Sequence, residues 1–246
     1  MKFISIAVRV AFLSLCLTGT ACSQTTNIEN EGASAEEAQL LADLRKLYPE
    51  PDFKSVRESA VPGLYEVMVG QNVGYMDKTG RYMIQGQMLD LQKKTNLTEP
   101  ALKVAKRINV NNLPLEDAFK VVNGDGSRLV YIFADPDCPY CKELEASMAL
   151  VKDVTAYIFL FPIKDIHPDA YRKSVGIWCA SDRSKAWLSV MLSQASIATA
   201  ECDNPVDRNI ALAQRLGIDG TPTIILQNGD RYEGGLTAEA LNSELR

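Results

Sequence analysis

The sequence contains a single histidine, His167, and only one pair of cysteines separated by two residues, Cys138 and Cys141. A structural zinc site needs four cysteine or histidine ligands, so a lone pair is a poor candidate for half of one. The chain also lacks a basic run and an internal repeat, and its net charge of −5 argues against a nucleic-acid surface. These absences leave a redox dithiol as the main interpretation of the pair, with a purely structural bridge as the alternative.

The first 21 residues predict a signal peptide. Lys2 and Arg9 supply positive charge, and a short apolar core follows at residues 10–17, ahead of small residues. This core is too short for a membrane span. The chain as a whole has 46% hydrophobic and 23% charged residues, which is typical of a soluble protein of one or two domains. We therefore expect export to an oxidising compartment, where disulfides can form.

Cys22 is a candidate lipidation site. Residues 17–22 resemble a bacterial lipobox, in which the cysteine becomes the acylated N-terminus, although Gly19 departs from that motif. Ordinary signal-peptidase cleavage after Ala21 remains an equal alternative. Either outcome is compatible with residues 22–39, whose polar composition without aromatics predicts a flexible tether.

The Cys-x-x-Cys pair follows an apolar segment, residues 128–134, that predicts a strand, and it opens a segment of helix formers. Cys138 is thereby placed at a helix N-terminus, where free N–H groups and the helix dipole favour thiolate over thiol. We expect it to be the exposed nucleophile and Cys141, one turn later, to be the more buried resolving thiol. The nearby carboxylates of Asp135 and Asp137 oppose the thiolate.

A second motif lies at residues 220–223, where Thr221 and Pro222 precede an apolar strand. A cis Thr221–Pro222 bond would bring the backbone of Thr221 against the Cys138 sulfur and leave its polar groups free to pair with an extended substrate. An ordinary trans proline at the start of an edge strand is the alternative.

Residues 133–141, 220–223 and 63–67 together resemble the periplasmic disulfide isomerases of the DsbC and DsbG type, over about residues 40–245. The Pro-Tyr dipeptide between the cysteines is closer to DsbG. The resemblance implies a C-terminal α/β thioredoxin-like domain with a helical insertion, a small α+β dimerisation domain before it, and a connecting helix. It further implies a homodimer, misfolded exported proteins with disulfides as clients, an inner-membrane disulfide reductase as electron donor, and no cofactor or metal.

The organisation that we predict is a signal peptide at 1–21, a tether at 22–39, a dimerisation domain at 40–97, a linker helix at 98–110 and a catalytic domain at 111–246. Apolar spacing predicts a helix from residue 40 that ends before Pro49, and strands at 64–69, 73–76, 81–84, 115–122, 128–134 and 156–162. The segment from 167 to 205 is expected to be helical and to form the insertion.

Cys179 and Cys202 lie 23 positions apart within this insertion, and we expect them to form a structural disulfide, with two free buried cysteines as the alternative. His167, just before a predicted helix, is expected to face solvent because nothing in the sequence directs it at Cys138. Trp178 and Trp187 are expected in the core.

The function that we predict is thiol-disulfide interchange on exported proteins. Cys138 attacks a substrate disulfide and forms a mixed disulfide, which a substrate thiol displaces in isomerisation or Cys141 displaces in reduction. A dithiol oxidase is one alternative, although the upstream domain argues against it. A chaperone that binds unfolded chains in a dimer cleft is another.

Overall fold

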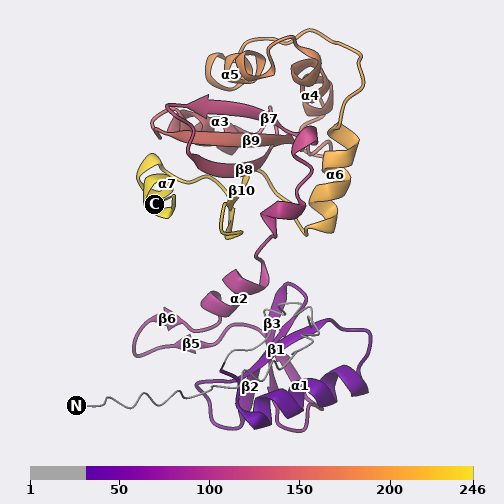
Figure 1. Cartoon of the computed structure of the whole chain (residues 1–246), viewed down its shortest axis with the longest axis vertical. Helices are drawn as coiled ribbons and strands as arrows, with labels where there is room; N and C mark the ends of the chain where they lie inside the picture. The colour runs from indigo at the N-terminus through magenta and orange to yellow at the C-terminus, as the bar shows by residue number, and fades with distance from the viewer. Residues whose placement is uncertain (1–31, 246) are drawn as a thin grey trace, which may run out of the picture.

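The computed structural model describes residues 32–245, so the predicted signal peptide, Cys22 and most of the predicted tether lie outside the described residues. A four-stranded and a five-stranded sheet form the centres of two domains, with helix α2 (Glu99–Ala105) between them (Figure 1). The predicted combination of an α+β and an α/β domain is confirmed. None of the helices in residues 32–245 is long and apolar enough to cross a membrane.

The N-terminal domain packs one helix against an antiparallel sheet. The sheet has the order β1 (Phe53–Glu58), β2 (Leu64–Val69), β3 (Asn72–Asp77), β4 (Met83–Gln85). Helix α1 (Ala35–Leu47) buries Leu40, Leu41 and Leu44 against Phe53, Val56, Tyr65, Val67 and Met76 of the sheet. The short hairpin β5 (Leu89–Asp90) and β6 (Thr95–Asn96) extends from this domain (Figure 1).

Helix α1 begins earlier than the sequence predicts. Its first residue is Ala35, so the assignment of residues 35–39 to a flexible tether is wrong. Ser34 and Glu37 form a capping box: Ser34 Oγ accepts from the Glu37 amide at 3.2 Å, and Glu37 Oε2 accepts from the Ser34 amide at 2.6 Å. These bonds satisfy amides that have no partner within the helix. They stabilise the first turn of α1 although the segment is polar.

The predicted strands at 64–69 and 73–76 are confirmed as β2 and β3, while β4 lies two residues after the start predicted at 81. Strand β1 was not predicted. Only Phe53 and Val56 are buried in it, and this three-residue spacing lacks the alternation that marks a half-buried strand.

Helix α2 is shorter than the linker helix predicted at 98–110. It ends at Ala105 because the chain beyond it bonds to the C-terminal domain: the Ile108 amide donates to the Gly229 carbonyl at 3.0 Å. Gly229 has a φ of +86°, and a Cβ there would lie 2.4 Å from the Ile108 carbonyl oxygen, so the close approach requires glycine. Arg107 Nε and Lys103 Nζ pair with Asp230 at 2.6 and 3.0 Å, which attaches the end of α2 to the same turn.

The C-terminal sheet has the order β11 (Arg231–Glu233), β10 (Thr223–Leu226), β8 (Arg128–Ala134), β9 (Val154–Leu160), β7 (Phe119–Asn123). Strands β8 and β9 run parallel, and the other neighbouring strands run antiparallel. Alternate residues of β8 face opposite layers: Val130 and Ile132 lie in the core cluster with α3 (Pro139–Met148), and Tyr131 and Phe133 in the cluster with α6 (Val206–Arg215). The predicted strand at 115–122 instead begins with a 3₁₀ turn, Leu115–Asp117, before β7.

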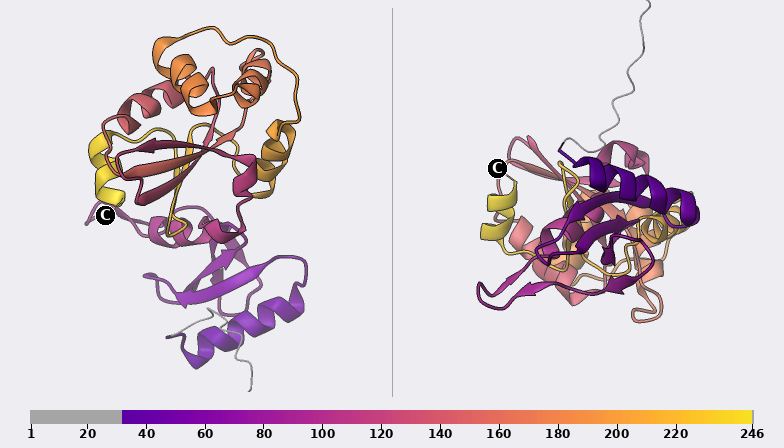
Figure 2. Two further views of the ribbon diagram at one scale, coloured as in Figure 1. Left: turned by 45° about the horizontal axis from the view of Figure 1, so that its top comes forward. Right: turned by 90° about the horizontal axis from the view of Figure 1, so that it is seen from below.

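The insertion between β9 and α6 contains α4 (Ala170–Cys179) and α5 (Arg183–Ser193), which cover one end of the domain (Figure 2). Residues 194–205 are not helical, so the predicted helical segment ends too late. The prediction of two core tryptophans is confirmed, since Trp178 and Trp187 are buried, and Trp187 Nε1 donates to the buried Glu145 carboxylate at 2.8 Å.

A disulfide joins Cys179 at the end of α4 to Cys202 in the non-helical segment, with 5.9 Å between their Cα atoms. Replacing both cysteines by alanine is expected to lower the free energy of unfolding by about 3 kcal/mol, because the bridge closes a loop of moderate length in the unfolded chain. Urea unfolding of the double variant and the parent measures this difference. An unchanged midpoint would show that the bridge does not contribute to stability.

Candidate active site

The two thiols of the Cys-x-x-Cys pair lie where β8 is followed by α3. Cys138 is the N-cap of α3 with an extended backbone (φ −66°, ψ 122°), and Pro139 occupies the first helical position, where a missing N–H costs nothing. The N–H groups of the first turn have no partner within the helix. They and the helix dipole therefore favour negative charge at the Cys138 sulfur.

The Thr-Pro loop lies directly against this sulfur. The Thr221–Pro222 bond is cis, and Cys138 Sγ lies 3.3 Å from the Thr221 carbonyl oxygen, to which Cys138 donates when it is protonated. The structure thus brings together two motifs that lie 83 residues apart in the chain. Pro222 is buried and precedes β10, the neighbour of β8 in the sheet.

Cys138 is not the exposed side chain that the sequence predicts. It is 4% exposed and Cys141 is 2% exposed, so both thiols are covered in the folded domain. The cover over Cys138 comes in part from the Thr221 carbonyl, which belongs to a loop that sequence distance does not connect to the helix. The two thiols therefore differ less in exposure than in the groups that contact them.

Those contacts shift the pKa values of the two thiols in opposite directions. The Cys141 thiol, then the Thr221 side chain and the backbone amides of the first helical turn, lower the pKa of Cys138 to about 5, against the opposing effect of burial. The Thr221 carbonyl favours the protonated form, because only a thiol can donate to it. Burial and the neighbouring Cys138 raise the pKa of Cys141. At neutral pH Cys138 is a thiolate and Cys141 a thiol.

His167 does not face solvent as predicted. Its side chain is 19% exposed, and Nδ1 lies 3.0 Å from Oδ2 of the fully buried Asp135. Asp135 Oδ1 accepts from the Asp137 amide at 2.7 Å, and Oδ2 also accepts from the Ile163 amide at 2.8 Å. A buried carboxylate is costly without such partners. The bonds from Ile163 and His167 hold the segment after β9 against the loop that precedes Cys138.

Asp137 also has a partner from outside the motif. Its Oδ1 lies 2.5 Å from Nζ of Lys173, one turn into α4, and both side chains are mostly buried. Sequence reasoning did not single out Lys173 or the pairing of His167. The two acids beside Cys138 indicate that cations lie nearby. The sequence does not show which cations the fold brings there.

Two exposed apolar side chains lie next to the motif residues. Tyr140 stands between the two cysteines, and Ile166 precedes His167. The main chain at residue 140 also lies near the loop after β11, since a Cβ added at Gly235 would lie 3.7 Å from the Tyr140 carbonyl oxygen. Exposed apolar side chains at this place suit contact with an unfolded polypeptide.

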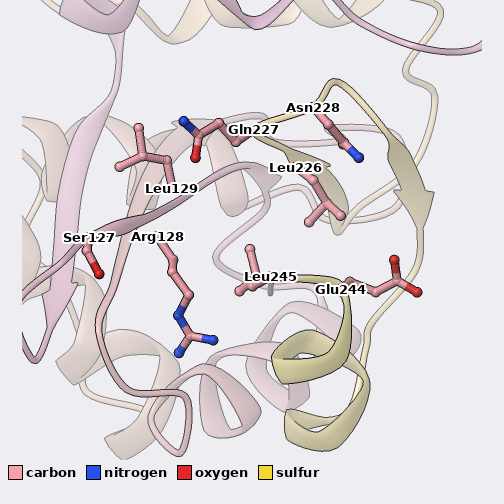
Figure 3. A pocket seen from close by; sticks show the side chains of 8 residues that line it. All are labelled: Ser127, Arg128, Leu129, Leu226, Gln227, Asn228, Glu244 and Leu245. Carbon is pink, nitrogen blue, oxygen red and sulfur yellow. The ribbon is translucent and has the colours of Figure 1, made fainter.

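A separate cavity of about 410 Å³ lies at the other end of the central strands, at the start of β8, the end of β10 and the end of α7 (Ala238–Glu244) (Figure 3). Arg128, the basic side chain in it, donates to Asn242 Oδ1 at 3.2 Å and to main-chain carbonyls of residues 152 and 153. Because β8 runs from Arg128 to Ala134, the cavity is a full strand length away from Cys138. It is not part of the dithiol site.

The chain matches two family models. Residues 115–246 match a thioredoxin-like domain, and residues 31–99 match the N-terminal domain of disulfide bond isomerase proteins. The two matches correspond to the five-stranded and the four-stranded domain respectively.

Two curated relatives are similar to most of the chain, and one solved structure is similar to about half of it. It is 37% identical over 194 residues to a probable thiol:disulfide interchange protein DsbC of Bordetella pertussis, covering 79% of this chain and 68% of the relative. It is 30% identical over 207 residues to the thiol:disulfide interchange protein DsbC of Escherichia coli K12, covering 82% and 84%. A crystal structure of a disulfide interchange protein from Neisseria gonorrhoeae is 40% identical, with a TM-score of 0.53, and covers 55% of this chain and 96% of that one.

Proposed function

The chain belongs to the DsbC family of thiol:disulfide interchange proteins, and from this premise we propose that it isomerises or reduces non-native disulfides of exported proteins through Cys138 and Cys141. The observation that carries the proposal is the Cys138 sulfur at the start of α3, with a pKa of about 5, beside the backbone of Thr221. A thiolate at neutral pH is the attacking species in disulfide exchange.

In isomerisation, the Cys138 thiolate attacks one sulfur of a substrate disulfide. A bond forms between Cys138 Sγ and that sulfur, and the second substrate sulfur leaves as a thiolate. Another thiolate of the substrate then attacks the substrate sulfur of the mixed disulfide and releases Cys138 as a thiolate. The substrate ends with a different disulfide, and neither protein is oxidised or reduced.

In reduction, Cys141 completes the reaction. It loses its proton and attacks Cys138 Sγ, so the Cys138–Cys141 disulfide forms and the substrate leaves with two thiols. Burial raises the pKa of Cys141 and keeps it protonated at neutral pH, which slows its attack and gives a substrate thiol time to act first. Each reduction consumes two electrons, and we propose an inner-membrane disulfide reductase as their donor.

Thr221 and Pro222 are the substrate-binding residues in this proposal. The Thr221 main chain lies beside the reacting sulfur, where an extended substrate segment can add hydrogen bonds as an extra strand would. The exposed Tyr140 and Ile166 side chains then contact apolar residues of the client.

The N-terminal domain supports a homodimer. Strand β4 is an edge strand whose three residues are all exposed, and Ile84 in it and Tyr82 just before it present large exposed side chains. Such an edge offers unpaired backbone groups and apolar contact to a second copy of the chain. We propose that two β4 edges, or β4 with the adjoining surface, form the dimer and set two Cys138 sites around one client.

We also propose that the mature protein is periplasmic, with Cys22 either acylated as a lipoprotein or left by ordinary cleavage. Cys22 lies outside the described residues. The first helix of the described residues, α1, begins at Ala35. Metabolic labelling with a fatty acid, compared between the parent and Cys22→Ser, distinguishes the two fates.

Reactivation of a scrambled multi-disulfide protein by a catalytic amount of the reduced full chain tests the proposed function. We expect faster reactivation that requires Cys138 and no added oxidant. An oxidase would instead form disulfides in a reduced client and leave the scrambled client inactive. A chaperone would assist a cysteine-free client equally well with its thiols blocked. Either of these results would overturn the proposal.

A further inference from the structure

Two carboxylates lie within the three residues before the nucleophile, and the structure gives each a cation or donor from the helical insertion. Asp135 is met by His167 and by main-chain amides, and Asp137 is met by Lys173. A carboxylate next to a thiolate raises the free energy of the thiolate by like-charge repulsion. The partners of these two acids therefore bear on the reactivity of Cys138.

Asp137 is the residue adjacent to Cys138, and its carboxylate has limited access to water. The side chain is 18% exposed, so solvent screens its charge incompletely. Its main chain is also held in place, because its amide donates to Asp135 Oδ1 at 2.7 Å. An unpaired charge on the residue next to Cys138 would disfavour the thiolate by like-charge repulsion.

Lys173 supplies the opposite charge at a distance of 2.5 Å from Asp137 Oδ1. Its helix, α4, is joined to the rest of the insertion at two points: the Cys179–Cys202 disulfide holds its end, and Arg172 Nη1 donates to the Ile197 carbonyl at 3.1 Å. The ammonium is thus positioned by the insertion and not by the active-site motif. Lys142 on α3 adds a further positive charge in the sequence of the motif, but residues 32–245 show no ion pair for it with Asp137.

From this geometry we propose that Lys173 is a positioning residue for the dithiol: its ammonium neutralises the Asp137 carboxylate and so keeps Cys138 in its reactive thiolate form. The inference deepens the proposed function by assigning to the helical insertion a part in setting the acidity and redox equilibrium of the Cys138–Cys141 pair. It rests on the proposed role of Cys138 as the nucleophile.

Thiolate absorbance of the reduced full chain, titrated against pH, tests the proposal in a charge cycle. Lys173→Met leaves Asp137 unpaired and is expected to raise the apparent pKa of Cys138. At a given pH near the midpoint, the ratio of thiolate to thiol should fall by about threefold to tenfold. Asp137→Asn leaves the ammonium in place and is expected to shift the titration in the opposite direction. The double variant is expected to lie close to the parent, and Lys173→Arg to retain the parent titration.

The equilibrium with glutathione provides a second readout. A less stable thiolate makes the dithiol easier to oxidise, so Lys173→Met should shift this equilibrium toward the disulfide by a similar factor, and Asp137→Asn should shift it toward the dithiol. Lys185→Met, at an exposed position of α5, is the matched control and is expected to change neither readout.

The sign of the Asp137→Asn shift separates a charge effect from structural damage. Loss of a merely structural contact would lower the thermal midpoint and would move the titration of both single variants in the same direction, which contradicts the proposal. A Lys173→Met titration that superimposes on the parent contradicts it as well. If Cys138 in the parent has no thiolate absorbance at neutral pH, the proposed nucleophile itself is wrong, and the failure lies with the proposed function.

Discussion

Replacing Cys138 by alanine is expected to abolish both reductase and isomerase activity, with a loss on the order of a thousandfold or more, since it is the only thiol within residues 32–245 whose pKa is lowered for the first attack. Residues 32–245 contain two free cysteines, Cys138 and Cys141, and burial raises the pKa of the second. Insulin reduction and reactivation of a scrambled multi-disulfide protein measure the two activities. Retention of a substantial part of either activity in Cys138→Ala would show that another group begins the reaction.

Cys141→Ala is the matched variant, and its expected behaviour differs in kind. Cys138 still attacks, but the mixed disulfide no longer has an internal thiol to resolve it, so covalent complexes with clients should accumulate and reduction should stop. Isomerisation needs only Cys138 and a client thiol and should persist in part. Accumulation of complexes in Cys138→Ala instead of Cys141→Ala would reverse the two assigned roles.

The pH dependence follows from the same acidities. Cys138 has a pKa of about 5, below that of an ordinary thiol, so the thiolate population stays near its maximum at neutral pH and falls only as the pH drops through about 5. The rate of alkylation of Cys138 by iodoacetamide should therefore change little between pH 7 and pH 6, whereas an unperturbed thiol loses about tenfold over that unit.

The local part of the site could be predicted from the sequence. An apolar strand followed by Cys138, Pro139 and helix formers places the first cysteine at a helix N-terminus, because each of these preferences acts over a few neighbouring residues. The same holds for β2 and β3, whose apolar residues lie in continuous segments.

The parts that could not be predicted depend on contacts between distant residues. The linker helix ends at Ala105 because Ile108 bonds to Gly229, more than a hundred residues later. His167 lies against Asp135 because the loop after β9 returns to the end of β8, and neither side chain indicates this by its own spacing. Local patterns predict which segments fold, but the partner of a buried charge is decided by the topology that brings the segments together.

The two domains are attached to each other in a way that bears on isomerase activity. Lys103, Lys106 and Arg107 at the end of α2 pair with Asp230 and Glu233, and Gln71 of the β2–β3 turn donates to the Leu216 carbonyl at 3.1 Å. These contacts tie α2 to the β10–β11 hairpin, whose first strand follows Pro222, and tie the N-terminal domain to the end of α6. A second chain bound at the N-terminal domain would accordingly hold its own Cys138 at a defined position relative to the first.

Replacing Ile84 by lysine is expected to convert the proposed dimer into a folded monomer and to lower isomerase activity by on the order of tenfold, while insulin reduction stays within about twofold of the parent. Ile84 lies on edge strand β4 and is 56% exposed, so the new charge costs little in the single chain. It is costly at an interface that buries it against a second copy without a partner. Isomerisation depends on holding a client while its own thiols exchange, whereas reduction can proceed at one Cys138 site. Sedimentation velocity and the two activity assays measure these effects.

Val122→Lys is the control, because Val122 is 55% exposed on β7, the edge strand of the other domain, and should leave both mass and activities unchanged. A dimeric Ile84→Lys would exclude β4 as the interface, and a monomer with full isomerase activity would show that one chain is sufficient for the reaction.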